Sequence, residues 1–418
     1  MKIWIVSVGE PLPVDGDNVR LRRMGNLASY ISDSGIDVEW FSVSFEHYQK
    51  IQRCNKDTDY VVNEHYSIHL AHVNGYKRNI SLSRVIHHKN AGKGIYKLMQ
   101  SLEKPDIILA SMEPLEVSSA TVKFANENDI PCIVDVRDLW PEIYYDVIPK
   151  ALHGVLNIYV NHCSKTLKRT MSSCDSIIGL SNGFLDYGLK YAGRNRKETD
   201  AVFPMAYPNY DYASYKDYFD ECWGKYGLRK EDFIVVFLGN FGDQFKFDEI
   251  VGVSEKFIEF KDIKFVLCGN GKHQDEIREK TKENVIIPGW IEKKQILSLL
   301  SYAKIGIAPY IDSMNYRLNT PNKFGEYLSA SLPIAVSVTG EMQELLNRHN
   351  CGAYYRNTED LFNIIDKYYR DKVLQKEASM NARALFEKMF NGDNANAKLL
   401  QHIIEISKVR GEKKNVTL

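Results

Sequence analysis

Short apolar runs that alternate with amphipathic helical segments limit most strongly how this chain can fold. In the first half, apolar runs lie at 3–8 and 38–43, and a helix with one apolar face is predicted between them over 20–34. Further runs follow at 106–110, 132–136, 176–183, 234–239, 264–269, 284–289, 305–309 and 333–338. Such alternation is typical of doubly wound α/β domains built on parallel sheets. It predicts two consecutive Rossmann-like domains that face a central cleft, joined by the aromatic, turn-rich stretch 205–232.

The charge balance and the cysteines exclude several classes of protein. Lysine and arginine together number 54, as do aspartate and glutamate, so no overall positive field favours nucleic acid as a partner. The 7 cysteines form no CxxC pair, which argues against a disulfide framework and a zinc site and fits a reducing compartment. The N-terminus lacks the apolar core of a signal peptide, and no window approaches the ~18 apolar residues of a membrane span. We therefore expect a cytoplasmic protein without a metal site.

The stretch 319–333, NTPNKFGEYLSASLP, predicts a helix whose start can hold an anion. Thr320 is expected to cap the helix, with Pro321 at its first position and Asn322 and Lys323 completing the first turn. Unpaired backbone N–H groups and the positive end of the helix dipole then lie beside a lysine, and a phosphate is the anion we expect. Glu326, one turn deeper, is predicted to accept hydrogen bonds from hydroxyls of the ligand. The alternative is a well-capped surface helix with an incidental lysine.

Glycines follow the neighbouring strands of the second half. They lie in the pairs Gly239 and Gly242, with Asn240 between them, and Gly269 and Gly271; Trp290 and Ile291 follow the third strand. Glycine turns let backbone amides approach a phosphate closely, and Lys246 is predicted to reach the same anion. The Trp290 ring and the free backbone groups beside it suit a nucleotide base, although a core tryptophan is the alternative. Together these strand ends suit the parts of a nucleotide diphosphate.

Charged residues also follow strands of the first half. Arg137 and Asp138 come directly after the run 132–136. There Arg137 is suited to a phosphate or carboxylate and Asp138 to a substrate hydroxyl, while a structural ion pair between the two is the alternative. The loop 9–16 is a candidate wall of the same site or an ordinary strand-to-helix loop. The basic stretch 77–97 suits anionic lipid head groups or a phosphorylated acceptor, and a solvated basic helix is its alternative.

The segments VDVRDLWPE and PNKFGEYLSASLPI, supported by FLGNFG, FVLCGNG and NVIIPGW, resemble the retaining nucleotide-sugar glycosyltransferases of family four, which have the GT-B fold. The most similar group makes bacterial O-antigen, capsule and related surface polysaccharides. The resemblance implies an acceptor-binding domain over 1–205, a donor-binding domain over 206–390 and a C-terminal helix over 391–418 that returns to the first domain. It further implies transfer of a hexose or N-acetylhexosamine from a UDP-sugar to a glycan or lipid-linked oligosaccharide, without a cofactor, at the inner face of the cytoplasmic membrane.

The same resemblance assigns roles to individual residues. Lys246 matches the basic residue on the donor diphosphate, and Glu326 matches the second acid of a Glu-(seven residues)-Glu motif that binds ribose hydroxyls. The phosphate-facing turn of that motif falls on Asn319, Thr320, Pro321 and Asn322, and Gly16 matches the glycine loop near the diphosphate.

Three departures from the family pattern bear on the proposed roles. Leu318 replaces the first acid of the motif, Asn240 replaces a frequent arginine, and Arg137-Asp138 replaces a His-Asp pair. Ser331 also replaces a common glycine. These departures keep two alternatives open: an epimerase or phosphorylase of the same fold, and a catalytically silent glycosyltransferase-like subunit.

Overall fold

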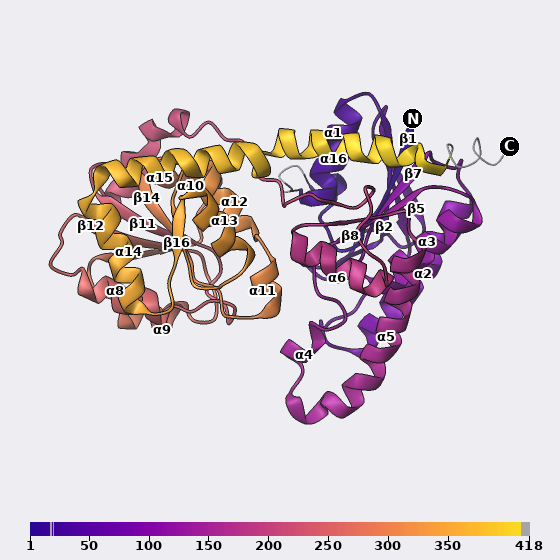
Figure 1. The fold of residues 1–418 in the computed structure, drawn as a ribbon, viewed down its shortest axis with the longest axis horizontal. Helices are drawn as coiled ribbons and strands as arrows, with labels where there is room; N and C mark the ends of the chain where they lie inside the picture. The colour runs from indigo at the N-terminus through magenta and orange to yellow at the C-terminus, as the bar shows by residue number, and fades with distance from the viewer. Residues whose placement is uncertain (17–18, 20, 411–418) are drawn as a thin grey trace. The chain divides into compact units, whose positions relative to one another are not determined.

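The computed structural model describes residues 1–16, 19 and 21–410, which form two compact units (Figure 1). The first unit contains Met1–Phe203 together with the chain from Ala395 onward, and the second contains Pro204–Asn394. The predicted helix 20–34 is α1, Arg23–Asp33; residue 20 lies outside the described residues. The predicted helix 391–418 is α16, Gly392–Ser407, and residues 411–418 likewise lie outside them.

The first unit is built on an eight-stranded sheet in the order β10-β9-β8-β7-β1-β2-β6-β5. All its neighbouring strands are parallel except β5 and β6. The strands are β1 Lys2–Val6, β2 Asp37–Val43, β5 Thr58–Asn63, β6 Tyr66–Ala71, β7 Ile107–Ser111, β8 Cys132–Val136, β9 Ser176–Gly179 and β10 Ala201–Val202. The helices before α16 are α1, α2 Leu82–Gln100, α3 Leu115–Glu127, α4 Tyr144–Val147, α5 His153–Ser173 and α6 Asn182–Ala192.

Alternation along β1 gives this sheet two covered faces. Ile3 and Ile5 belong to a buried cluster with α1 and with Leu399 and Ile403 of α16. Trp4 points to the other face, where its ring stacks on Phe124 of α3 at 5.7 Å. A parallel sheet buried on both faces explains why its strands read as unbroken apolar runs.

The second unit has six parallel strands in the order β13-β12-β11-β14-β15-β16. They are β11 Phe233–Leu238, β12 Ile263–Cys268, β13 Val285–Gly289, β14 Ala303–Ala308, β15 Ile334–Val336 and β16 Gly352–Tyr354. The helices are α7 Phe219–Trp223, α8 Asp248–Lys256, α9 Gln274–Lys280, α10 Lys293–Leu300, α11 Met314–Leu318, α12 Asn322–Ser329, α13 Glu341–His349, α14 Thr358–Arg370 and α15 Lys372–Leu385.

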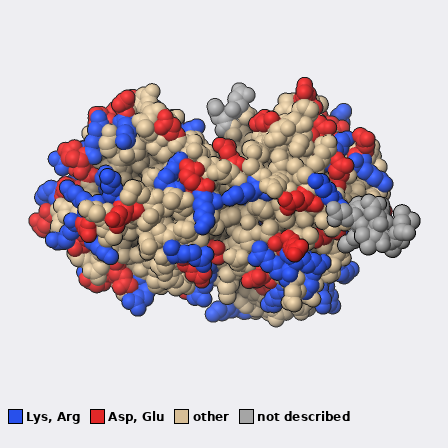
Figure 2. Space-filling view, turned by 45° about the horizontal axis from the view of Figure 1, so that its top comes forward, with Lys and Arg blue, Asp and Glu red and all other residues tan. Residues whose placement is uncertain are grey.

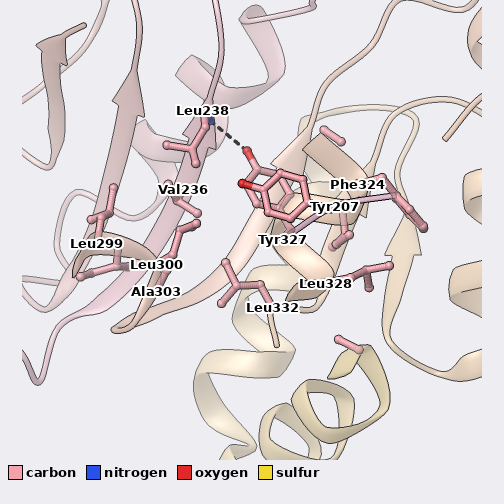
Figure 3. Close-up of a cluster of buried hydrophobic side chains, with 14 of the residues drawn as sticks. Tyr207, Val236, Leu238, Leu299, Leu300, Ala303, Phe324, Tyr327, Leu328 and Leu332 are labelled. Atoms are coloured by element: carbon pink, nitrogen blue, oxygen red, sulfur yellow. Dashed lines mark hydrogen bonds between the residues drawn. The ribbon is translucent and has the colours of Figure 1, made fainter. Parts of the chain in front are cut away.

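Helix α12 packs on one face of the second sheet, as its periodicity predicts. Phe324, Tyr327 and Leu328 are fully buried in a cluster that also contains Val236 and Leu238 of β11 (Figure 3). The Tyr327 hydroxyl accepts a hydrogen bond from the Leu238 N–H at 2.9 Å and lies 3.3 Å from the carbonyl oxygen of Ile307. These contacts attach α12 to the carboxyl end of β11.

The stretch 205–232, expected as a connection between domains, is part of the second unit's core. Phe219 and Trp223 are fully buried there, and the Trp223 Nε1–H donates to the Ser298 hydroxyl at 3.1 Å. Aromatic residues that read as a turn-rich linker are instead the side chains that cover α10.

Two surface properties follow from the described residues. Positive and negative side chains are interspersed over the visible face of the molecule, in keeping with their equal totals (Figure 2). No helix in the described part of the chain is both long and apolar enough to cross a bilayer.

Replacing Tyr327 by Phe should destabilise the protein by about 1–3 kcal/mol, because the buried Leu238 N–H loses its acceptor. Denaturant unfolding of the variant and of the wild type measures this difference. Tyr66→Phe is the matched control, since the buried Tyr66 hydroxyl has no hydrogen-bond partner among the described residues. Equal losses in the two variants would contradict the assigned role of the Tyr327 hydroxyl.

Candidate functional site

Glycines at the carboxyl ends of β11 and β12 let two backbone turns pack directly on each other. A Cβ atom on Gly269 would lie 1.8 Å from the Gly239 carbonyl oxygen, and one on Gly271 would lie 2.6 Å from the Phe241 nitrogen. The Gly269 N–H in turn donates to the Gly289 carbonyl oxygen at 2.8 Å. The predicted glycine turns are therefore present, and close backbone packing alone already requires two of their glycines.

The start of α12 differs from the prediction in its cap. The helix begins at Asn322, with Pro321 at the N-cap position and no side-chain capping bond. Thr320 is 2% exposed, and its Oγ1 has no hydrogen-bond partner among the described residues. The capping role assigned to Thr320 is wrong, because the helix begins one residue later than predicted and Pro321, whose side chain has no hydrogen-bonding group, occupies the N-cap position. An uncapped start and an unpaired hydroxyl leave two kinds of donor for an anion.

Lys323 lies at the end of β11. Its Nζ donates to the Leu238 carbonyl oxygen and lies 4.8 Å from the ring centroid of Phe237 and 4.7 Å from that of Phe245. Burial lowers its pKa to about 8. A Cβ atom on Gly239 would fall 2.2 Å from this nitrogen. The structure thus brings a lysine with a lowered pKa and the first glycine turn together.

Lys246 comes to the neighbouring strand end. Its backbone N–H donates to the Pro309 carbonyl oxygen at 2.7 Å, just past β14. The residue before it, Phe245, provides one of the two rings that contact Lys323. Lys246 is half-buried, and the described residues place no carboxylate within 4 Å of its Nζ.

Glu326 is buried, and its Oε1 accepts a hydrogen bond from the Tyr207 hydroxyl at 2.7 Å. Sequence reasoning missed Tyr207, because no local pattern connects a tyrosine in an apparent linker with a helix 119 positions away. The bond fixes one carboxylate oxygen at the α12 face of the sheet.

The other residues of this unit that were predicted to bind the donor differ in their exposure and in their partners. Trp290 is 77% exposed, so the alternative of a core tryptophan is wrong. The Ile291 side chain packs in the core, which leaves only its backbone for a ligand. The Asn240 side-chain oxygen accepts from Gln244 Nε2. Asn319 is half-buried and Asn322 is exposed.

In the first unit, Arg137 is held by internal partners. It forms an ion pair with Glu10 and donates to the Ser111 hydroxyl. Arg137 is therefore paired with Glu10, and its Nε also lies 3.9 Å from a carboxylate oxygen of Asp135. A ligand at Arg137 would have to compete with Glu10. Gly16 is the last described residue before a gap and has a positive φ of 144°.

Glu113, which sequence reasoning missed, lies at the same edge of the first sheet. Burial, and secondly the charge of Asp138, raise its pKa to about 8, and its Oε1 has no hydrogen-bond partner among the described residues. A carboxyl group that is neutral at pH 7 can donate a hydrogen bond. Glu113 could have been found in the sequence by the same pattern that pointed to Arg137, because both are charged residues just past a buried strand.

The described residues contain no group of three or more His, Cys, Asp or Glu side chains placed to hold a metal ion.

Comparison with known proteins gives one family match. Residues 232–371 match the family described as glycosyl transferases group 1. No curated protein matches the chain significantly in sequence.

Solved structures share the fold over nearly the whole chain. Sucrose-phosphate synthase from Thermosynechococcus elongatus superposes with a TM-score of 0.69 at 14% identity, covering 96% of this chain and 97% of its own. HepE from Anabaena, solved with UDP-glucose, gives 0.60 at 13% identity and covers 97% and 100%. WaaG, a glycosyltransferase involved in lipopolysaccharide biosynthesis, gives 0.64 at 13% identity and covers 96% and 99%. The fold is that of GT-B glycosyltransferases, with two Rossmann-like halves.

The pH dependence of stability tests the environment of Lys323. Between its folded pKa of about 8 and the ordinary lysine value near 10.4, the unfolded chain binds more protons, so stability should rise with pH. Lys323→Met removes this contribution. The difference in the free energy of unfolding between Lys323→Met and the wild type should favour the variant most below pH 8 and should shrink towards pH 10. Urea unfolding at a series of pH values measures this difference.

Lys256→Met, at an exposed position on α8, is the control and should show a difference that does not vary in this range. A difference for Lys323→Met that stays constant from pH 7 to 10 would contradict the buried position of the amine.

Proposed function

We propose that this chain, whose residues 232–371 match the family described as glycosyl transferases group 1, transfers a sugar from a nucleotide diphosphate sugar to a hydroxyl of a surface glycan. The observation that carries this proposal is the position of Lys323 beside the Gly239 turn, at the uncapped start of α12. A diphosphate needs cations and convergent N–H donors, and this strand edge supplies both.

The donor we propose is a UDP-sugar. Support comes from HepE, whose structures contain UDP and UDP-glucose, and from residues suited to each part of such a donor. Lys246 and Lys323 take the diphosphate together with the backbone N–H groups of Asn240, Gly242, Thr320 and Asn322. Glu326, with one oxygen held by Tyr207, takes the ribose hydroxyls. The exposed Trp290 ring and the backbone of Ile291 take the base.

The transfer we propose retains the anomeric configuration. The bond between the sugar C1 and the β-phosphate oxygen breaks, and the acceptor oxygen forms its bond to C1 on the same face. The departing β-phosphate takes the acceptor's proton. Lys246, Lys323 and the α12 amides stabilise the charge that grows on this phosphate, and this reaction needs no metal ion. In the first unit, Asp138 and the neutral form of Glu113 are suited to hydrogen bonds with the acceptor.

The acceptor we propose is lipid-linked and is met at the inner face of the cytoplasmic membrane. The stretch 77–97 exposes apolar and basic side chains together, which suits an anionic bilayer surface; the exposed residues are Lys77, Arg78, Ile80, Leu82, Ile86, Lys89, Lys93 and Lys97. His87 and His88 are buried, and burial lowers the pKa of both, that of His88 to about 3. They do not add to this positive surface at neutral pH.

A nucleotide panel tests the donor class. UDP at ~100 times its Kd should add about 2.7 kcal/mol to the free energy of unfolding, whereas GDP and ADP at the same concentration should add less. Thermal denaturation with each nucleotide measures this. No change in thermal stability with any of the three nucleotides would favour a catalytically silent subunit. Leu318 and Asn240, which depart from the family pattern, are the residues that suggest this alternative. Conversion of a UDP-sugar without any acceptor would favour an epimerase.

Replacement of the proposed donor-binding residues tests their roles. Lys246→Ala should weaken UDP binding about 10- to 100-fold, because a charge-assisted hydrogen bond is lost. Glu326→Gln should lower transfer from UDP-glucose about 100- to 1000-fold if the carboxylate orients the donor. Calorimetry and UDP release measure the two effects. Lys256→Ala is the control on the same unit, and wild-type values in the first two variants would refute the assignments.

A further inference from the structure

Three cations of the first unit gather where three successive strands end. Arg22 lies just before α1, in the segment that follows β1. Lys50 lies in the turn between β3, Phe45–Glu46, and β4, Ile51–Gln52, which follow β2. Arg84 lies in the first turn of α2, which follows β6. Ligands of open α/β sheets bind beyond the carboxyl ends of the strands, so these residues occupy the edge where a ligand is expected.

Aromatic rings hold the three cations in place. The Tyr76 ring has Lys50 Nζ 4.6 Å from its centroid and Arg84 Cζ at 5.6 Å. Both cations also bind Asn79, Lys50 at the side-chain oxygen (2.7 Å) and Arg84 at the carbonyl oxygen (2.8 Å). Arg22 Cζ lies 4.3 Å from the ring centroid of Tyr48, which occupies the same turn as Lys50. Arg22, Lys50 and Arg84 are called the Tyr76 cluster below, after the ring that contacts two of them.

The positive charge of the Tyr76 cluster is not neutralised by ion pairs. No carboxylate among the described residues lies within 4 Å of these three cations, whereas the nearby Arg23 and Arg53 pair with Asp135 and Asp15. The nearest acid of the turn, Glu46, accepts hydrogen bonds from the backbone N–H groups of Tyr48 and Gln49.

The field of these cations acts on the histidine between them. His47 contacts the Tyr76 hydroxyl at 2.6 Å and Lys50 Nζ at 3.2 Å. Burial, and then the charges of Lys50, Arg84 and Arg22, lower its pKa to about 4. His47 is therefore neutral at physiological pH and takes no share of the positive charge.

A cation packed on an aromatic ring still has N–H groups to donate. In Arg84, Nε donates to His88 and Nη1 to Asn79, and the guanidinium also hydrogen-bonds the Tyr76 side chain. These bonds use only part of its five N–H groups. Burial, and then the charge of Arg84, lower the pKa of Lys50, and the charge of Glu46 opposes this shift without cancelling it. An anion with several oxygens relieves the repulsion between such cations. A phosphate or diphosphate fits both the charge and the number of donors.

We infer that Arg22, Lys50 and Arg84 bind a phosphate or diphosphate group carried by the acceptor, so that the acceptor is a sugar phosphate or a sugar linked to a lipid diphosphate. This inference rests on the proposed glycosyl transfer, in which the first unit receives the acceptor. It adds the chemical class of the acceptor and the residues that select it.

The direct test is calorimetric titration of the full chain with inorganic pyrophosphate, with UDP present at saturation to occupy the second unit. Lys50→Gln and Arg84→Gln should each weaken pyrophosphate binding about 10-fold or more, because each removes a charge-assisted hydrogen bond. Lys50→Arg, which keeps the charge, should retain most of the affinity. Circular dichroism verifies that each variant is folded.

Lys123→Gln is the matched control. Lys123 also lies over an aromatic ring of the first unit, with Nζ 5.4 Å from the centroid of Tyr96, but it has a carboxylate partner in Glu127 at 3.7 Å. Its replacement should leave pyrophosphate binding unchanged. Wild-type binding in Lys50→Gln and Arg84→Gln, or an equal loss in Lys123→Gln, would overturn the inference.

Competition experiments distinguish the two sources of the phosphate. Displacement of pyrophosphate by glucose 6-phosphate indicates a sugar phosphate, and displacement by farnesyl diphosphate but not farnesol indicates a lipid diphosphate. Displacement by neither would mean an adventitious anion site and would overturn the acceptor assignment. The response of the wild type to UDP is measured separately, so failure of the donor proposal is distinguishable from failure of the Tyr76 cluster.

Discussion

Both backbone groups of Leu238 are bound by side chains of α12, and the candidate site depends on this attachment. The Leu238 N–H donates to the Tyr327 hydroxyl, and its carbonyl oxygen accepts from Lys323 Nζ. Tyr327 and Lys323 are one helical turn apart, so the two bonds fix the rotation of α12 as well as its distance from β11. The same attachment sets the helix start beside the Gly239 turn. These side-chain bonds therefore hold the end of β11 beside the start of α12, although the two elements are far apart in the sequence.

The local part of this arrangement is readable from the sequence. The spacing of Phe324, Tyr327 and Leu328 predicts the buried face of α12, and glycines after buried strands predict the turns. Thr320 was misjudged because a capping residue and a buried threonine look alike in a sequence, and only the packing around it decides. Trp290 was undecided for the same reason.

The long-range pairings are not readable from one sequence. The sequence offered only the neighbouring Asp138 as a partner for Arg137, but Arg137 also pairs with Glu10, 127 positions away. The hydroxyl that holds Glu326 comes from Tyr207, in a stretch that reads as a linker. Sheet topology creates these contacts by bringing distant strand ends to one edge, and hydrophobic periodicity carries no information about them. Of the Tyr76 cluster, the sequence singled out only the segment that contains Arg84, because Arg22 and Lys50 come from two other segments of the chain.

The central claim is that a nucleotide diphosphate binds at the carboxyl edge of the second sheet, and a crystal structure of the full chain with UDP tests it most directly. The account predicts diphosphate oxygens within hydrogen-bond distance of Lys323 Nζ and of backbone N–H groups at the start of α12, with Lys246 reaching the same group. UDP bound at another surface, with Lys323 still on the Leu238 carbonyl oxygen and no density beside α12, would contradict it.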